Sequence, residues 1–403
     1  MESEQYGTDM ALEHIRVLDL TMERGLYAGK QLADLGADVI KVEPLSGCQA
    51  RYIGPFKNDI PDIESSLYFI NFNTNKRSIT LNLRSREGQE IFKKLVVKSD
   101  VIIDDFQPGT MEIYGLGYTT LRGLNKGIIV ASITGFGRKG PYCQFKAPDI
   151  VSFAMGGSMF VSGTPSKPPV VAPAEQAYQS ASRISCFGIL VALYNRLIRG
   201  TGQLVEVSAQ EVVAAQEQEP IIRYGLNAEI MRRYGSQHIT APARTYHCKD
   251  GYVYLIAMFL EHWKALLELL GNPETLLDEA WESITFRRIN SDIIDPIVSE
   301  FTGKYTKEQV TQMCQERRIP CTPVYSPEEF ANDAHIQERE LVVQVNHPKI
   351  GQHGYILSRA LTESPCQIRR HAPVLGQHNY DVYCQEFGYS VKELERFKSD
   401  GVI

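Results

Sequence analysis

Short apolar runs alternate with amphipathic stretches along the first part of the chain. Residues 15–21 (IRVLDLT) and 37–44 (ADVIKVEP) are apolar runs, and the stretch between them has helical spacing and ends at Gly36. Continuous apolar runs bounded by turn residues are typical of parallel strands, which are buried on both faces of a sheet. The pattern therefore predicts a strand–helix–strand unit near the start of the chain.

The same alternation continues to about residue 137. Residues 77–83, 100–106 and 127–137 have the pattern of further strands. Between the first two of these, residues 86–99 form an amphipathic pattern in which apolar side chains recur on one helical face. Strands that alternate with helices in this way indicate the α/β class, with an open parallel sheet.

The pattern changes after about residue 224. Residues 243–258 alternate in polarity around Lys249-Asp250-Gly251, which predicts an antiparallel hairpin with a tight turn. Helical stretches follow within 260–271 and 306–317. We interpret this part of the chain as a smaller α+β domain.

Composition and charge exclude several classes of function. The net charge is −6 and there is no long basic run, which argues against a nucleic-acid partner. The apolar runs are shorter than a membrane span, and the start of the chain is polar, unlike a signal peptide. We therefore expect no membrane partner and a cytoplasmic location.

The cysteines and histidines do not predict a metal site. The chain has 8 cysteines, and none of them form a C-x-x-C pair or a cluster with zinc-ligand spacing. We expect reduced thiols that pack in the core, and no metal ion.

A glycine-rich segment follows the last predicted strand of the first part. Residues 135–140 (GFGRKG) match the spacing G-x-G-x-x-G, but Pro-Tyr-Cys follows where a dinucleotide-binding fold would begin a helix. A mobile loop or tight turn fits this sequence better than a nucleotide site. Arg138 and Lys139 stay candidates for contact with an anion.

Two further short motifs carry charge. Residues 73–78 (NTNKRS) place Lys76 and Arg77 beside Asn75, a set that suits a phosphate-bearing ligand or, alternatively, a solvated turn. Asp149 stands at a predicted helix start, and we interpret it as an N-cap.

Stretches distributed over nearly the whole chain resemble the class III CoA-transferase family, the group of formyl-CoA transferase and carnitine CoA-transferase. They occur in family order, at 32–44, 72–83, 100–118, 131–142, 147–157, 192–212, 245–257 and 375–403. The resemblance implies a large Rossmann-like domain made from both chain ends, a smaller α+β domain, and two chains that interlock as a dimer. The expected bounds are 1–210 for the first part of the large domain, 211–225 for a linker, 226–325 for the small domain and 326–403 for the return.

The family's chemistry is covalent. An aspartate attacks a CoA thioester, forms a mixed anhydride, and then an enzyme-bound thioester that passes CoA to a second carboxylic acid. A CoA thioester is thus the expected substrate, and no tightly bound cofactor is needed. The resemblance implies that the residues contacting CoA are Asn75, Lys76, Arg77, Phe106, Arg138 and Lys139.

The catalytic position departs from the family pattern. Between Pro168-Pro169 and residues 192–196 the family pattern fits without a gap, and the aspartate's place falls on Tyr178. A phenol cannot form and return the mixed anhydride as a carboxylate does. The nearest carboxylate is Glu175, which is either a displaced nucleophile or an exposed loop acid.

Two other departures concern the CoA site. Asp105 stands where the family has an asparagine, and Ile113 stands where it usually has an arginine. An added negative charge and a lost arginine should weaken the binding of a polyanionic ligand.

Three hypotheses follow from the resemblance and these departures. First, the chain is the catalytically silent subunit of a heteromeric CoA-transferase whose homologous partner carries the aspartate. The two-chain succinyl-CoA:benzylsuccinate CoA-transferases of anaerobic toluene degradation are similar in this respect. Second, it is an active homodimeric CoA-transferase that uses Glu175. Third, it is a different CoA-dependent enzyme, or an acyl-CoA sensor, on the same scaffold.

Overall fold

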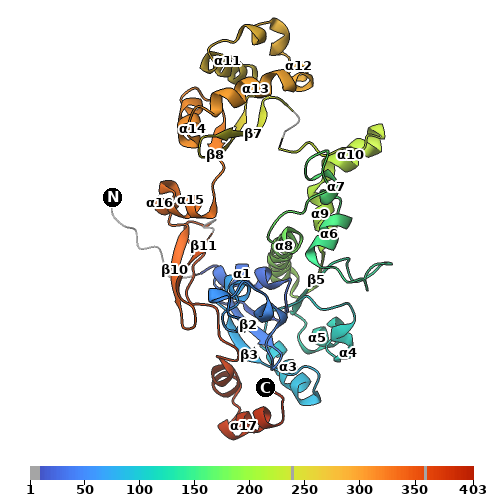
Figure 1. Ribbon diagram of the computed structural model, residues 1–403. Coiled ribbons are helices and arrows are strands. Elements are labelled where there is room, and N and C mark those ends of the chain that lie inside the picture. Colours follow the sequence, from blue (N-terminus) through green and yellow to red (C-terminus); the bar gives the residue numbers. More distant parts are fainter. Residues whose placement is uncertain (1–9, 237–239, 358–360) are drawn as a thin grey trace. The chain divides into compact units, whose positions relative to one another are not determined.

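A computed structural model describes residues 10–236, 240–357 and 361–403, which form two units (Figure 1). The larger unit combines the described residues up to Ser158 with Val171–Ile222 and Gln337–Ile403. The smaller unit consists of Met159–Val170 and Arg223–Ile336. The larger unit therefore takes residues from both halves of the chain. Residues 211–225, expected as a linker, lie largely in two helices, α9 (Ala209–Gln216) and α10 (Gln218–Asn227).

The larger unit is built on a parallel sheet of six strands, which confirms the predicted α/β class. The strand order is β3-β2-β1-β4-β5-β6. The strands are β1 (Arg16–Asp19), β2 (Asp38–Glu43), β3 (Arg77–Thr80), β4 (Val101–Asp104), β5 (Ile129–Thr134) and β6 (Leu204–Ser208). The order reverses between β1 and β4, and in open α/β sheets such a reversal leaves a crevice outside the carboxyl ends of the strands.

Helices cover both faces of this sheet because side chains of successive strand residues point to opposite faces. Val17 and its counterparts pack against α1 (Leu26–Asp34), α8 (Gln176–Arg199) and α9. Leu18 and its counterparts pack against α3 (Arg86–Val97), α5 (Tyr118–Leu124) and α17 (Val391–Ser399). The result is a three-layer arrangement with two separate apolar cores (Figure 1).

The long helix α8 lies on the sheet through a face of small side chains. Ala177, Ala181, Ser185 and Ala192 are buried there, and the helix contacts α1, β5 and β6. Among the described residues it is the one helix with the length and composition of a membrane span. One face of the helix packs against β5 and β6, while other apolar side chains, such as Phe187 and Tyr194, are exposed.

The end of the chain extends the large unit beside β3. His378 donates its backbone N–H to the Ser78 carbonyl, and the Asn379 side chain accepts from the Thr80 backbone N–H. A separate hairpin, β10 (Val342–His347) and β11 (Gly351–Ile356), precedes this segment. Shorter helices α2 (Leu67–Phe72), α4 (Thr110–Ile113) and α6 (Asp149–Met155) complete the surroundings of the sheet's carboxyl edge.

The smaller unit has an antiparallel sheet and its own core. Its strands are β7 (Ala243–Cys248), β8 (Gly251–Ile256) and β9 (Cys321–Pro323), and Cys248 pairs with Gly251 across the turn, as the sequence predicts. Its helices include α11 (Leu260–Leu269), α12 (Ile284–Ile289), α13 (Ser291–Thr302), α14 (Lys307–Gln315) and α15 (Pro327–Asn332). Trp263 and Trp281 lie in this core.

A buried charge cluster lies at the carboxyl ends of β1 and β2. Asp19 and Lys41 pair directly in the parallel register, and the Lys41 ammonium lies 3.2 Å from the Asp19 carboxylate. Lys76, just before β3, lies 2.7 Å from the other carboxylate oxygen. All three side chains are fully buried. Above them α1 passes with Gly29, where a Cβ atom would lie 2.5 Å from Asp19 Oδ2 and 3.2 Å from Lys76 Nζ.

Replacement of Gly29 by alanine should destabilise the large unit. The added methyl group must displace a buried ion pair, and overpacking of this kind costs about 1–3 kcal/mol. The matched control is Gly123→Ala in α5, where a Cβ atom meets nothing within 4 Å. That change should be neutral or stabilising by up to about 1 kcal/mol, because alanine is the better helix former. Chemical denaturation measures both, and equal effects would contradict the close approach at Gly29.

Candidate active site

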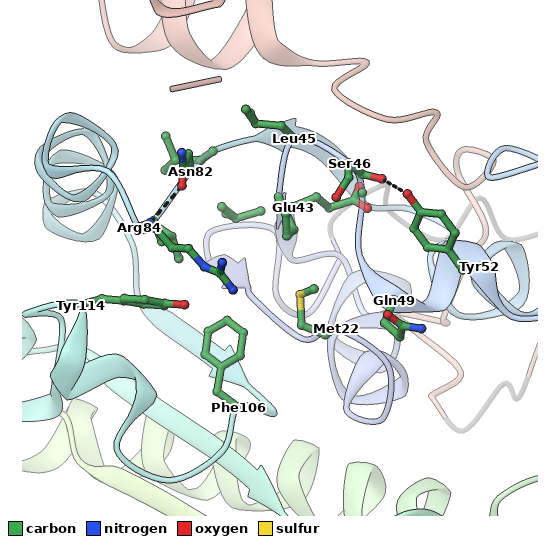
Figure 2. Close-up of a pocket in the computed structure, with 15 residues that line it drawn as sticks. Met22, Glu43, Leu45, Ser46, Gln49, Tyr52, Asn82, Arg84, Phe106 and Tyr114 are labelled. Atoms are coloured by element: carbon green, nitrogen blue, oxygen red, sulfur yellow. Dashed lines mark hydrogen bonds between the residues drawn. The ribbon is translucent and has the colours of Figure 1, made fainter. Parts of the chain in front are cut away.

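A pocket of ≈ 970 Å³ lies at the carboxyl ends of β2 and β3, beside the end of β4 (Figure 2). Its walls come from the loop after β1, the loop after β2, the loop after β3, and the segment that follows β4. The lining residues are Met22, Val42, Glu43, Pro44, Leu45, Ser46, Gly47, Gln49, Tyr52, Leu81, Asn82, Leu83, Arg84, Phe106 and Tyr114. This is the edge at which open α/β sheets bind their ligands.

Arg84 is the only basic residue among those that line the pocket. Figure 2 shows its guanidinium reaching into the pocket near the rings of Tyr114 and Phe106. Within the described part of the chain, its side chain forms no hydrogen bond or ion pair. The acidic Glu43 is committed elsewhere, because its carboxylate binds the buried Arg51 at 2.7 and 2.9 Å. The pocket therefore offers one available cation beside two aromatic faces, a combination that suits a phosphate-bearing aromatic ligand.

The loop between β1 and α1 is fixed by hydrogen bonds from two buried lysines and by hydrogen bonds to one carboxylate. Lys41 donates to the Thr21 carbonyl, and Lys76 donates to the Leu26 carbonyl at 2.8 Å. The backbone N–H groups of residues 22–25 all donate to the carboxylate of Asp105, which follows β4. The N···O distances are 2.7, 3.1, 2.8 and 3.1 Å in chain order. Carbonyl groups at the ends of the loop are thus bound by ammonium groups, and the amide groups between them share one carboxylate.

Asp104, the neighbour of Asp105, is buried at the end of β4. Its Oδ1 accepts from the Phe106 backbone N–H at 3.2 Å, and its Oδ2 has no hydrogen-bond partner among the described residues. Burial, and then the charge of Asp105, raise the pKa of Asp104 to about 7.

Tyr178 lies in the core, in the first turn of α8. Its side chain is 3% exposed, and the phenol donates to the Ala147 carbonyl at 2.7 Å. The Arg24 guanidinium lies 5.4 Å from the ring centroid. Burial raises the pKa of the phenol, so it is neutral at physiological pH. Tyr178 is therefore a packed structural residue, and its oxygen is not presented to a ligand.

Asp149 caps a helix other than its own. It is the first residue of α6, yet its Oδ1 accepts from the Tyr178 backbone N–H at 2.9 Å, in the first turn of α8. The expectation that Asp149 caps the helix that begins at residue 149 is therefore wrong. It caps the start of α8 instead. Sequence spacing points to the nearest helix, whereas the fold brings the start of α8 to this carboxylate.

Glu175 is half-buried, not an exposed loop acid. It precedes α8 in a left-handed conformation, with φ 52°, and its carboxylate accepts from the Tyr68 hydroxyl at 2.5 Å. Burial raises the pKa of the nearby Glu23, and the charges of Glu175 and Asp105 raise it further. Three carboxylates therefore gather near the starts of α1 and α8.

Comparison with known proteins identifies the family. Residues 12–379 match the model of CoA-transferase family III. The chain belongs to this family. It is 37% identical to the formyl-CoA:oxalate CoA-transferase of Streptomyces avermitilis over 98% of this chain and 99% of that protein. It is 31% identical to the succinyl-CoA–L-malate CoA-transferase alpha subunit of Chloroflexus aurantiacus, over 98% of this chain and 93% of that protein.

A solved structure supports the same assignment. The fold matches a CAIB/BAIF family protein from Brucella suis with a TM-score of 0.84 and 28% identity, over 94% of this chain and 100% of that one. A class III CoA-transferase uses a CoA thioester as its substrate.

Three of the residues expected to contact CoA serve the fold of this family III chain. Asn75 donates to Asp34 and accepts from the Arg369 backbone, and it is 3% exposed. Lys76 belongs to the buried cluster with Asp19. Arg77 bridges Asp38 and Glu386. All three side chains are thus engaged within the chain, and their contact with CoA stays a prediction.

The other three expected contact residues lie in two different places, Phe106 at the pocket and Arg138 and Lys139 in the loop after β5. Phe106 lines the pocket, and its contact with CoA stays a prediction. The Arg138 guanidinium binds Glu112 at 2.7 Å, and Lys139 is exposed beyond it in the loop after β5. Asp105, expected to repel a polyanionic ligand, accepts hydrogen bonds from four backbone N–H groups, and the repulsion stays a prediction. Ile113, at the place of the lost arginine, is 83% exposed, whereas its neighbour Tyr114 faces the pocket.

Sequence reasoning missed Arg84 and the residues of the loop after β2. Arg84 directly follows the apolar run 77–83, so the rule that ligands meet the carboxyl ends of parallel strands would have found it. Gln49 and Tyr52 follow β2 in the same way.

The pH dependence of stability should report the buried carboxyl of Asp104. A pKa raised from 3.8 to about 7 means that the folded state holds a proton that the unfolded state releases. The free energy of unfolding should therefore decrease as the pH rises from 3.8 to about 7, by at most about 1.4 kcal/mol per pH unit. Asp104→Asn removes this contribution, so the variant should gain stability relative to the original chain as pH rises. Denaturant titrations across this range measure the difference, and parallel curves would contradict a buried neutral Asp104.

Proposed function

We propose that this chain is the non-nucleophilic subunit of a heteromeric class III CoA-transferase. One observation carries the proposal: Tyr178, which the resemblance aligns with the family's aspartate, is buried, and its hydroxyl is bonded to the Ala147 carbonyl. This buried phenol cannot act as the nucleophile that attacks a thioester. A small side-chain rotation would not bring a carboxylate into its place. A homologous partner chain supplies the aspartate in this proposal.

The pocket supports a role in binding the CoA thioester as a substrate. Its volume falls in the range of pockets that hold a nucleotide-sized ligand. Arg84 can bind a phosphate of CoA, and Phe106 and Tyr114 offer ring faces to the adenine or the pantetheine arm. Asn82, Ser46 and Gln49 add neutral hydrogen-bonding groups. A substrate that must leave after each turnover fits a site with one available cation.

The exposed face of α8 supports a partner chain. Ile184, Phe187, Val191, Tyr194 and Ile198 recur at alternating spacings of three and four residues, and they are 47–67% exposed. This is the spacing of an apolar seam that packs against another helix. Such a seam on the surface of a single chain marks an interaction site. The interlocked dimer expected from the family would cover it.

We also propose substrates and a location. Succinyl-CoA is the donor, in keeping with the related succinyl-CoA–L-malate CoA-transferase alpha subunit of Chloroflexus aurantiacus. A dicarboxylic acid such as benzylsuccinate is the acceptor, on the resemblance to the two-chain enzymes of toluene degradation. The enzyme works in the cytoplasm without a bound metal or redox cofactor.

Glu175 offers a second candidate function, that of an active homodimer. Its carboxylate is fixed by Tyr68 and lies three residues before Tyr178, at the start of α8. A nucleophile held at a helix start would be placed near the family position. A CoA-dependent enzyme of another kind, or a sensor, is the third possibility and predicts CoA binding without exchange in any complex.

The composition of the native complex and a Glu175→Gln variant test the first two functions together. We expect the purified enzyme to contain a second family III polypeptide with an aspartate at its catalytic place. Glu175→Gln in this chain should then change succinyl-CoA-dependent transfer by less than about twofold, whereas Asp→Asn in the partner should lower it by about 10⁴-fold or more, as loss of a nucleophile does.

A single polypeptide in the complex, together with loss of transfer in Glu175→Gln, would overturn the silent role. Tyr68→Phe serves as the matched control, because it removes the hydroxyl that holds Glu175 and leaves the carboxylate in place. Under the silent role, neither change lowers the turnover number.

Arg84→Gln should weaken CoA binding by about tenfold, because a guanidinium–phosphate pair contributes roughly 1–3 kcal/mol. Titration calorimetry with CoA at two salt concentrations measures the loss, which should shrink at high salt. Arg86→Gln is the control, since Arg86 is exposed at the start of α3 and does not line the pocket. Equal affinity of the Arg84 variant and the original chain would place CoA elsewhere.

A further inference from the structure

The loop of residues 22–25 forms a binding site for an anionic oxygen. Its four consecutive N–H groups converge on one carboxylate, with Oδ1 of Asp105 accepting from Met22 and Oδ2 accepting from Glu23, Arg24 and Gly25. Successive backbone N–H groups that converge in this way are a known anion-binding arrangement. The loop leads directly into α1, whose dipole adds to the attraction for negative charge.

The arrangement of these N–H groups does not depend on Asp105 alone. The carbonyls on either side of the loop accept hydrogen bonds from buried lysines. Lys41 donates to Thr21, and Lys76 donates to Leu26. The Thr21 backbone N–H and hydroxyl both donate to Asp19, at 2.9 and 2.6 Å. Both ends of the loop are thus fixed by a buried cluster that Asp105 does not join. The loop should keep its shape when the carboxylate of Asp105 is removed.

We propose that Asp105 is an internal ligand that occupies this N–H loop and closes it to the carboxylate or thioester oxygen of a substrate. The site belongs to the class that binds small carboxylates. Its relevance to catalysis rests on the proposed function: a chain whose anion-binding loop is filled by its own side chain has a second reason, besides Tyr178, to be silent.

The surrounding charges make simultaneous occupancy by a substrate anion unfavourable. Burial, and then the charges of Glu175 and Asp105, raise the pKa of Glu23, and burial followed by the charge of Asp105 raises the pKa of Asp104. Arg24 is the basic residue of the loop itself, and its guanidinium lies over the Tyr178 ring and 3.9 Å from the Glu23 carboxylate. A second carboxylate would therefore enter beside the carboxylates of Asp105 and Glu23, with Arg24 as the cation of the loop.

The chemistry of the two carboxylate oxygens suggests the variants. Asp105→Ala removes both oxygens and leaves space for a small anion. Asp105→Leu also removes the charge but fills the same space with an apolar side chain of similar shape. Asp105→Asn keeps one acceptor for Met22 and replaces the other, so that the three N–H groups bound by Oδ2 lose their partner.

The test is rescue of thermal stability by acetate, measured on the full chain with its partner where one is present. Chloride at equal ionic strength is the reference. Asp105→Ala should lower the unfolding midpoint, and acetate should raise it again in a saturable way. The original chain and Asp105→Leu should show no saturable response, because the space is filled in both.

Equal effects of acetate on all variants, or no effect on Asp105→Ala, would overturn the proposal. If Asp105→Ala does not fold, Asp105→Ser decides instead, since its smaller side chain leaves part of the space open and should respond to acetate more than Asp105→Leu. Asp105→Asn fills the space as aspartate does and should not respond. The result is independent of the silent role: rescue can fail in a complex whose partner carries the nucleophile, and it can succeed in a homodimer that uses Glu175. The two proposals can therefore be rejected separately.

Discussion

The ion cluster of Asp19, Lys41 and Lys76 fixes the loop between β1 and α1 at the carboxyl edge of the sheet. Burial alone would oppose ionisation of Asp19, but the two ammonium groups hold its pKa at about 2. Burial lowers the pKa of Lys76 to about 8 against the attraction of Asp19. Two cations facing one anion leave an excess of positive charge. The two ammonium groups therefore also donate hydrogen bonds to backbone carbonyls, Lys41 to Thr21 and Lys76 to Leu26. A buried charge must be paired or hydrogen-bonded, so the loop between β1 and α1 has little freedom.

The loop in turn links the two parts of the site. Met22 forms part of the pocket wall, whereas Glu23 and Arg24 lie toward Glu175 and Tyr178. Asp105 joins the loop to the end of β4, across the point where the strand order reverses. The crevice that open α/β sheets leave at this point is therefore occupied by a network of the chain's own charges, and the pocket lies beside it, over β2 and β3.

The sequence could predict the elements but not the use of their polar groups. Continuous apolar runs identify parallel strands because both faces of the sheet are buried, and this held for all of β1 to β5. Lys76 and Arg77 were expected to contact CoA, because local sequence does not reveal the strand register that pairs them within the chain. Only the pairing of β1, β2 and β3 brings Lys76 to Asp19 and Arg77 to Asp38, and it leaves Arg84 as the cation in the pocket. The alignment of Tyr178 with the family's aspartate rests on the resemblance and stays a prediction. The direction of its phenol depends on Ala147, 31 residues away, which the local sequence does not reveal.

The starts of both α1 and α8 are satisfied by carboxylates from elsewhere in the chain. Asp105 serves the loop that enters α1, and Asp149 serves the first turn of α8. Strained or partly unsatisfied groups at an active site cost stability. In our proposal this subunit does not perform the chemical step and is free of such a cost. Internal carboxylates and a buried tyrosine then replace reactivity with packing, and what remains under selection in our proposal is the pocket for CoA and the apolar face of α8.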